Sequence, residues 1–224
     1  MIRRLSLRGV ELWKDERRIL GPLDCDIDSD RPVVLMGPSG SGKSTLLNWL
    51  IGALPPAFSA KGHILLDGAE IGHLPIQARR LGILFQDDLL FPHLSVAENL
   101  GFGLPAGLSR AERQARIVAG LAEAELSGLG ERDPASLSGG ERARIALMRT
   151  LLSDPRALLL DEPFAKLDVA LRGRFRSLVF DRAAIRNLPV LLVSHDPADA
   201  EVARGAVITL GDPTRAANSA SRQT

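Results

Sequence analysis

The sequence predicts an α/β fold in which a parallel sheet is covered by other elements on both faces. Three short runs, at 33–36, 157–160 and 190–193, contain apolar residues only, and strands without polar alternation are typical of such a sheet. A glycine-rich turn and a helical segment follow the first run, which is the order of a strand–turn–helix unit. The chain of 224 residues, 45% of them hydrophobic and 25% charged, has the balance of an ordinary globular protein.

Local signals predict the elements around these runs. A helix is expected over 109–125, because Ser109 is a suitable N-cap and Glu112 stands at the spacing of a capping box. The strand that begins at residue 62 ends in an Asp-Gly turn. The remaining predicted elements are strands at 62–68, 81–85 and 207–210 and helices at 46–51, 140–152 and 169–185.

Composition excludes several classes of protein. Lys and Arg total 28 against 27 Asp and Glu, a net charge of +1, so the summed charge gives no footprint for nucleic acid. The single cysteine, Cys25, rules out an intrachain disulfide and a cysteine metal cluster, and it fits a reducing compartment. There is no signal-peptide pattern, and no apolar run approaches the ~20 residues that a membrane-spanning helix needs.

Residues 37–45 match the phosphate-loop pattern of Gly, four residues, Gly-Lys and Ser or Thr. Glycines let the backbone curl so that its N–H groups point at phosphate oxygens, and the following helix adds its positive end. Lys43 is expected to reach the β- and γ-phosphates and Ser44 to ligate Mg²⁺; the alternative is a solvated Gly-Ser turn. The expected nucleotide contacts are Gly37, Pro38, Ser39, Gly40, Ser41, Gly42, Lys43, Ser44 and Thr45.

Two carboxylates, Asp161 and Glu162, follow the apolar run at 157–160. In an α/β sheet this places them at the carboxyl edge, beside a phosphate loop. Asp161 is expected to hold Mg²⁺, directly or through water, and Glu162 to activate the attacking water as a general base. Paired carboxylates alone are common, so this assignment depends on the loop and on the apolar strand before them.

A second anion site is predicted where residues 137–142 open a helix. A serine and two glycines at a helix N-terminus offer N–H groups to an anion, although an ordinary N-capped helix has the same pattern. One nucleotide has one γ-phosphate, yet the chain has two helix starts that could bind it. A dimer explains both if each nucleotide lies between the loop of one chain and this segment of the other. The expected contacts with the partner chain's nucleotide are Ser138, Gly139, Gly140 and Glu141.

In this order the motifs resemble those of the ATP-binding subunits of ABC transporters, over nearly the whole chain. Residues 37–45 resemble the Walker A loop, 137–141 the ABC signature and 158–162 the Walker B motif. The resemblance implies an α/β fold of the P-loop NTPase type, with an ABC-type core, a small antiparallel β layer and an inserted α-helical subdomain. It also implies ATP hydrolysis, with ATP and Mg²⁺ as the bound groups.

The resemblance assigns roles to residues outside these motifs. It makes Gln86 a Mg²⁺ ligand that senses the γ-phosphate, His195 a hydrogen-bond donor to the γ-phosphate, and Asp168 a contact across the dimer. It places Trp13 where an aromatic ring stacks on adenine; the alternative is a half-buried anchor of the first strand. The implied catalytic residues are Glu162, His195, Lys43 and Gln86.

Two departures from the family pattern concern the dimer. Glu141 stands where glutamine is usual, and its negative charge is expected either to weaken the contact with the partner's nucleotide or to pair with Arg142 or Arg144. The loop at 164–168 lacks a serine that is common there, which removes one hydroxyl from the expected contact between the two chains.

The segment at 89–100 closely resembles that of bacterial importer ATPases of the thiamine, ferric-iron, polyamine and molybdate kinds. In the family this region accepts a coupling helix of the permease, so Asp87, Phe91 and Leu94 are the implied permease contacts; otherwise they belong to a loop before a helix. The ATPase of a small exporter or of a lipoprotein-releasing system shares every catalytic motif, so this function remains an alternative. An ABC protein of DNA maintenance or translation fits less well, because there is one cassette and no coiled-coil insertion. A small-molecule kinase would leave the signature without a purpose.

The resemblance implies one ABC ATPase domain over 1–224. The implied partners are a second copy in a homodimer, integral-membrane permease subunits and, indirectly, an extracytoplasmic substrate-binding protein, with no nucleic acid. The implied location is peripheral, on the cytoplasmic face of the inner (plasma) membrane. An ATPase core is expected at about 1–87 and 153–210, with an antiparallel β layer near 1–30 and 60–72. A helical subdomain is expected at about 88–152 and a flexible tail at about 214–224.

Overall fold

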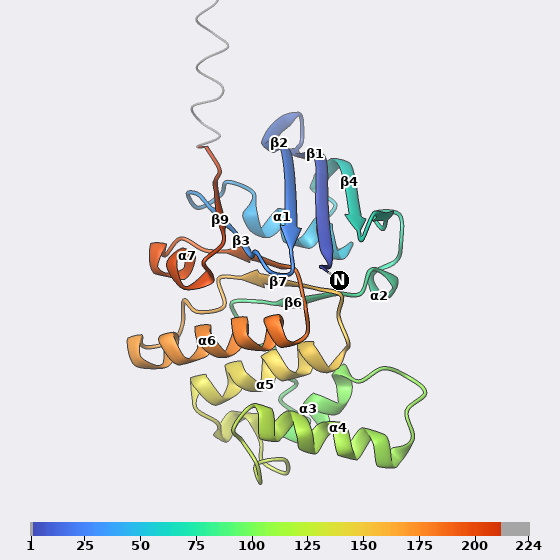
Figure 1. Ribbon diagram of the computed structural model, residues 1–224, viewed down its shortest axis with the longest axis vertical. Coiled ribbons are helices and arrows are strands. Elements are labelled where there is room, and N and C mark those ends of the chain that lie inside the picture. The colour runs from blue at the N-terminus through green and yellow to red at the C-terminus, as the bar shows by residue number, and fades with distance from the viewer. Residues whose placement is uncertain (1, 212–224) are drawn as a thin grey trace, which may run out of the picture.

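The structure, a computed structural model, describes residues 2–211 and consists of two sheets above a layer of helices (Figure 1). The tail predicted at 214–224 lies outside the described residues. In the described part of the chain, no helix has both the length and the apolar character that crossing a membrane requires. The elements in chain order are β1 (Arg4–Lys14), β2 (Arg17–Asp28), β3 (Val33–Met36), α1 (Lys43–Ile51), β4 (Phe58–Leu66), β5 (Ala69–Glu70), α2 (Ile76–Arg79), β6 (Leu81–Leu84), α3 (Val96–Gly103), α4 (Arg110–Glu123), a 3-10 turn (Pro134–Ser136), α5 (Gly139–Leu152), β7 (Ala157–Asp161), α6 (Val169–Ile185), β8 (Val190–Val193), α7 (Pro197–Ala203) and β9 (Ala206–Thr209).

The larger sheet has the strand order β6-β7-β8-β3-β9, and each neighbouring pair is parallel. The predicted parallel sheet is therefore confirmed, and the three apolar runs form its inner strands. In register, Val193 pairs with Leu35 on one side and with Asp161 on the other. The ends of β3, β7 and β8 consequently meet at one edge, where the glycine loop, the two carboxylates and His195 follow them.

Successive residues of the inner strands point to opposite faces, and each face has its own core. On one face Leu35 and Leu159 pack with the antiparallel sheet and α1. On the other face Leu158 and Leu192 pack with the helices α3 to α6. All four side chains are buried. Burial on both faces explains why no polar residue alternates with apolar ones in these strands.

The smaller sheet has the order β2-β1-β4-β5 and is antiparallel in every pairing. It confirms the expected antiparallel layer, but β4 begins at Phe58, earlier than the predicted strand. The reason is the length of β1, which pairs as far as Lys14 opposite Phe58. Gly62 permits this pairing: its φ is +113°, and a Cβ there would lie 2.8 Å from the carbonyl oxygens of Arg8 and Gly9.

Helix α3 lies in a segment whose sequence indicates only a loop before a helix. Ser95 and Glu98 form a capping box at its start, but eight residues with two glycines form a weak helix in isolation. Packing supplies the missing stability. Leu100 is fully buried, and Gly103 approaches α5 so closely that a Cβ would lie 2.2 Å from the Arg149 carbonyl oxygen.

The lone cysteine leads to a prediction about stability at high pH. Cys25 is buried in β2, and burial raises the pKa of its thiol to about 11. The folded thiol therefore stays protonated where the unfolded thiol ionises, and the free energy of unfolding falls as the pH rises through that interval. Between pH ~9 and pH ~11 we expect Cys25 to contribute a fall of roughly 2 kcal/mol. Urea unfolding of wild type and of Cys25→Ala measures it as their difference; a difference that does not change with pH would contradict the prediction.

Candidate functional site

The glycine loop lies between β3 and α1, at the edge of the parallel sheet where β7 and β8 also end (Figure 1). Gly42 is the N-cap of α1 with a φ of +91°, and a Cβ there would lie 3.4 Å from the Leu20 side chain. At Gly37 a Cβ would lie 3.1 Å from the Ser41 hydroxyl oxygen. Among the described residues no side chain caps the start of α1, so the N–H groups of its first turn have no side-chain acceptor, as an anion site requires.

Lys43 holds the loop together from inside. The side chain is buried, and its Nζ donates to the carbonyl oxygens of Gly37 at 2.8 Å and Pro38 at 2.9 Å. Ser41 Oγ is also buried and has no hydrogen-bond partner within residues 2–211. Phosphate oxygens would satisfy both a buried ammonium and an unpaired buried hydroxyl. The loop therefore fits a nucleotide phosphate.

A hydroxyl and a carboxylate lie together beside the loop. Ser44 Oγ donates to Asp161 Oδ1 at 3.0 Å, which joins the first turn of α1 to the end of β7. Burial raises the pKa of the Asp161 carboxyl, and the Ser44 hydrogen bond acts in the opposite direction. Hydroxyl and carboxylate oxygens are the ligands that Mg²⁺ takes in proteins. The two residues therefore fit a Mg²⁺ ion next to a bound phosphate.

Glu162 and His195 meet at the ends of β7 and β8. Glu162 has a φ of +47°, which is uncommon for a residue other than glycine, and its N–H donates to the Val193 carbonyl oxygen at 3.0 Å. His195 Nδ1 lies 3.1 Å from Glu162 Oε2. Both residues line a cavity of about 340 Å³. A carboxylate and an imidazole at this distance are suited to accept a proton from an attacking water.

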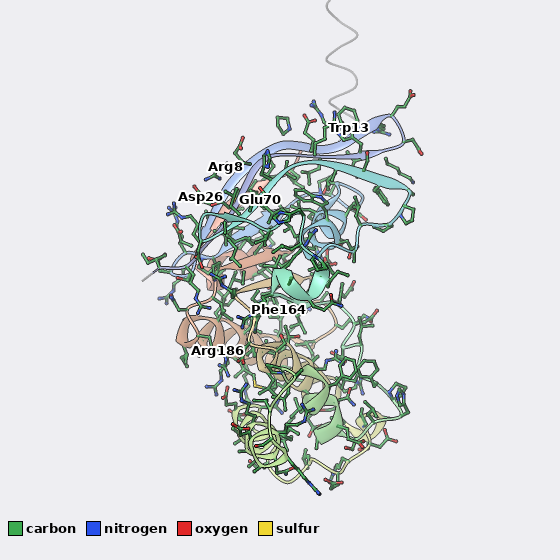
Figure 2. The ribbon with its side chains drawn as sticks, turned by 90° about the vertical axis from the view of Figure 1, so that its right-hand side faces the viewer. Arg8, Trp13, Asp26, Glu70, Phe164 and Arg186 are labelled. Carbon is green, nitrogen blue, oxygen red and sulfur yellow. The ribbon has the colours of Figure 1, made fainter. Side chains whose placement is uncertain are left out.

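Trp13 lies near one end of the antiparallel sheet, on the β1–β2 hairpin (Figure 2). The same hairpin reaches the glycine loop, since Leu20 packs at Gly42. The ring centroid is 5.9 Å from the Arg18 guanidinium and 5.8 Å from the Lys61 ammonium. Its Nε1 is buried and has no hydrogen-bond partner among the described residues. The half-buried ring fits both the predicted platform for a base and the alternative of an anchor of the first strand.

The segment predicted to reach a partner's nucleotide begins helix α5. Ser138 is its N-cap, and Ser138 N and Oγ both donate to Glu141 Oε2 at 2.7 Å in a capping box. These hydrogen bonds hold the pKa of the Glu141 carboxyl below its usual range. Of the two expectations for Glu141, the pairing with Arg142 or Arg144 is therefore wrong, and these arginines pair with other carboxylates. The reason is geometric, because a side chain at the third helical position reaches back to the N-cap.

The two helix starts that the sequence predicts to bind anions do not contact each other within one chain. Within the described part of the chain, no hydrogen bond or ion pair joins residues 138–141 to the glycine loop. Gly139 is exposed, whereas a Cβ at Gly140 would lie 3.2 Å from the Leu171 side chain of α6. The separation of the two segments is what a nucleotide held between two chains requires.

The loops after β6 and β7 meet at a second cavity, of about 600 Å³. Gln86, Asp87 and Lys166 line it, and Asp87 forms an ion pair with Lys166. Gln86 is exposed and, in the described chain, is not hydrogen-bonded to the other predicted Mg²⁺ ligands. Asp168 is exposed and caps α6, where its Oδ1 accepts from the Leu171 N–H at 3.0 Å.

Phe91 belongs to a cluster that the sequence did not reveal. Its ring centroid is 4.5 Å from that of Phe102, which is 67% exposed, and 5.5 Å from the Arg149 guanidinium. Asn99 is fully buried and holds the loop: its Oδ1 accepts from Phe91 N–H at 2.8 Å, and its Nδ2 donates to the carbonyl oxygens of Phe91 and Leu94. No pattern in the sequence marks Asn99, because the segment around it predicts only a loop before a helix.

Comparisons with known proteins agree with this geometry. The ABC transporter family model matches residues 20–165. The chain is 48% identical over 202 residues to the ABC transporter ATP-binding protein YnjD of Escherichia coli (strain K12), which covers 88% of this chain and 93% of that protein. It is 48% identical over 169 residues to the thiamine import ATP-binding protein ThiQ of Cereibacter sphaeroides, with 75% and 72% covered. It is 35% identical over 207 residues to the Fe(3+) ions import ATP-binding protein FbpC of Escherichia coli (strain K12), with 92% and 59% covered.

A solved structure shares the fold. The ATP-binding cassette MJ0796, in a dimeric post-hydrolysis state bound to ADP and Pi, matches with a TM-score of 0.76 and 30% sequence identity, over 93% of this chain and 95% of that one. The resemblance inferred from the motifs is confirmed, and so is the α/β fold with its ABC-type core. This chain therefore belongs to the ABC transporter family and is an ATP-binding subunit that hydrolyses ATP.

Proposed function

We propose that the chain is the motor subunit of an importer of a small molecule, and that it works as a homodimer on a membrane permease. The observation that carries the proposal is half of a nucleotide site at one sheet edge: the glycine loop, the Ser44–Asp161 pair and the Glu162–His195 pair. The other half begins α5 and is not joined to the loop in the same chain. The named function of the relatives ThiQ and FbpC supports import.

In this proposal each residue of the half-site has one task. Residues 37–45 cradle the phosphates, and Lys43 offsets the charge that develops on the γ-phosphate. A water oxygen attacks the γ-phosphorus, Glu162 accepts the proton that the water loses, and ADP is the leaving group. His195 donates a hydrogen bond to a γ-phosphate oxygen. Mg²⁺, held by Ser44 and Asp161, offsets phosphate charge when it is bound.

Two further residues complete the proposed binding of nucleotide. Gln86, exposed on the loop that follows β6, would join Ser44 and Asp161 as a ligand of Mg²⁺. Trp13 stacks on the adenine from the β1–β2 hairpin, with the Arg18 and Lys61 side chains near the same ring.

The dimer closes each site with the partner chain. Ser138, Gly139, Gly140 and Glu141 approach the γ-phosphate bound to the other subunit, and Asp168 contacts the other chain close by. The dimeric state of MJ0796 with ADP and Pi supports this arrangement. In the proposed organisation the core (about 1–87 and 153–210) holds the half-site, and the helices of about 88–152 carry the completing segment.

The permease binds the exposed face around Phe91. Asp87 supplies a charge, Phe91 and Leu94 supply apolar contacts, and Phe102 extends the apolar patch because most of its side chain is exposed. Asn99 keeps the loop rigid enough to transmit a displacement of the helices. The chain then lies at the cytoplasmic face of the inner membrane, bound through the permease.

Co-purification tests the proposal. Membranes of the native host are solubilised gently, the Glu162→Gln chain is captured with ATP and Mg²⁺, and the bound proteins are identified by mass spectrometry. We expect an integral-membrane permease, and the binding protein that accompanies it indicates the substrate class. Capture of a permease from an exporter or from a lipoprotein-releasing system would contradict import and show that the chain serves export. Recovery without any membrane protein would contradict the transport role.

A matched pair of surface variants shows whether the capture is specific. Glu162→Gln/Phe102→Asp places a charge on the exposed ring next to Phe91 and is expected to lose the permease. Glu162→Gln/Val118→Asp changes an equally apolar residue of α4, 55% exposed, and is expected to retain it.

A further inference from the structure

Behind His195 lies a buried network of charged groups to which the sequence motifs assign no role. Arg176 of α6 is 8% exposed and Asp199 of α7 is 3% exposed. The two form an ion pair. Removing charges from water is costly, and a buried ion pair often contributes no more to stability than apolar residues of the same size. The function of this pair is therefore sought in its position next to His195 rather than in a contribution to folding stability.

The network binds the residue on each side of His195. Arg176 also pairs with Asp196 Oδ2 at 2.8 Å. The Ser194 hydroxyl donates a hydrogen bond to Asp199 Oδ2, and Ser194 Oγ accepts one from the Asp196 N–H at 3.0 Å. Asp196 Oδ1 in turn caps α7. Through these contacts, both neighbours tie the backbone that carries the imidazole to α6 and α7.

A second arginine extends the network to the loop after Glu162. Arg172, one turn before Arg176 on α6, donates to Asp196 Oδ2 at 3.2 Å and to the carbonyl oxygen of Leu167 at 3.1 Å. Leu167 precedes Asp168, the residue proposed to contact the other chain. One helix face therefore connects the loop at the proposed dimer contact with the loop that carries His195.

The same network forms a wall of the hydrolysis site. The cavity of about 340 Å³ that Glu162 and His195 line is also lined by Arg172, Asp196 and Asp199. His195 itself is exposed, with 65% of its side chain accessible, and lies 3.1 Å from Glu162 Oε2. An exposed ring is not held by packing, so its distance from Glu162 depends on the backbone on which it stands.

We infer that Arg176 is a positioning residue for hydrolysis: with Asp196 and Asp199 it holds His195 at its distance from Glu162, and Arg172 links this position to the 163–168 loop. The inference rests on the roles proposed above for Glu162 and His195. Arg176 does not touch the reacting atoms; it acts through the segment 194–196.

A double-mutant cycle on ATP hydrolysis by the full chain tests this role. Arg176→Met is expected to lower kcat by roughly 10- to 100-fold, as when a reacting group is misplaced by about 1 Å, while KM for ATP changes less than about twofold. His195→Ala also lowers kcat, and Arg176→Met/His195→Ala is expected to be no slower than His195→Ala alone, because both act through one group. Arg176→Lys restores part of the rate. A double variant that is slower by the product of the two single effects would overturn the inference.

Hydrogen exchange gives a readout that does not require turnover. In Arg176→Met without nucleotide, amides of 194–199 are expected to exchange at least ~10-fold faster, whereas those of 33–36 in β3 keep their wild-type rates. Arg172→Gln tests the same loop if Arg176→Met does not fold, because Arg172 has a side chain that is 28% exposed and its replacement keeps the buried Arg176–Asp199 pair. In this variant, too, the amides of 194–199 are expected to exchange faster than in wild type. Arg182→Met is the matched control on α6, since Arg182 pairs with Glu123, and both readouts should match wild type.

The outcomes separate the inference from the proposed function. A wild-type kcat for His195→Ala would remove the proposed role of His195. A large loss in His195→Ala, together with wild-type kcat and wild-type exchange in Arg176→Met, would overturn only the positioning role of Arg176.

Discussion

The Glu162→Gln variant is expected to bind ATP as wild type does and to hydrolyse it at least ~100-fold more slowly, which is about 2.7 kcal/mol of activation free energy. Glutamine has the size of glutamate and keeps a polar atom at the 3.1 Å contact with His195, so the local geometry persists. A neutral amide cannot accept the proton of the attacking water. ATP therefore stays intact between the two chains, and an ATP-bound dimer accumulates.

Three measurements check this result: equilibrium binding of ATP, steady-state phosphate release, and light scattering after size exclusion with ATP and Mg²⁺. Glu201→Gln, an exposed carboxylate of α7, is the matched control and should keep wild-type turnover. Undiminished phosphate release by Glu162→Gln, with binding intact, would show that another group is the general base.

The Ser138→Arg variant is expected to prevent ATP-dependent dimerisation and to lower hydrolysis to the level of the separated chains, while nucleotide still binds to the glycine loop. The long side chain would occupy the space in which the partner's γ-phosphate is proposed to lie. Lys43, Ser44 and Asp161 belong to the half-site that binds the chain's own nucleotide. They are not bonded to Ser138, which belongs to the segment that completes the partner's site. Binding of ATP to the monomer should therefore be retained, with light scattering showing a monomer at every ATP concentration.

The loss of a helix cap must be separated from the loss of the interface. Ser109 and Glu112 form the same capping box at the start of α4, so Ser109→Arg removes an equivalent cap, which costs about 1 kcal/mol, and should still dimerise. Ser138→Asp keeps a good N-cap but places a negative charge opposite phosphate, and we expect it to dimerise poorly. Dimerisation of Ser138→Arg at wild-type ATP concentrations would contradict the sandwich between two chains.

The elements closest to the proposed chemistry were the most predictable. The strand at Val33–Met36, the glycine loop and the helix α1 appear in the predicted order, and β7 and β8 match the predicted runs closely. Each carries a local signal: an apolar run for a doubly covered strand, and glycines where the backbone must have a positive φ, as at Gly42. The capping boxes of Ser109 and Ser138 are likewise local, since both partners lie within one turn.

Other features had no local signal. Helix α3 contains two glycines and forms because Leu100 is buried and Gly103 packs against α5. Pairing with Arg142 or Arg144 was one of two expectations for the Glu141 carboxylate, which caps its own helix instead. Arg176 of α6 is buried, and no local signal separates it from the other arginines of that helix.

By itself the sequence determined the parallel sheet, the order of the phosphate loop, the two carboxylates and the histidine, and the membership of the ABC family, because each depends on residue types at short, fixed spacings. Only the tertiary structure decided which long-range contacts hold these groups: Ser44 to Asp161, Glu162 to His195, and Arg176 to Asp196 and Asp199. Such contacts join residues on separate elements, and their geometry follows from sheet order and helix packing rather than from local periodicity.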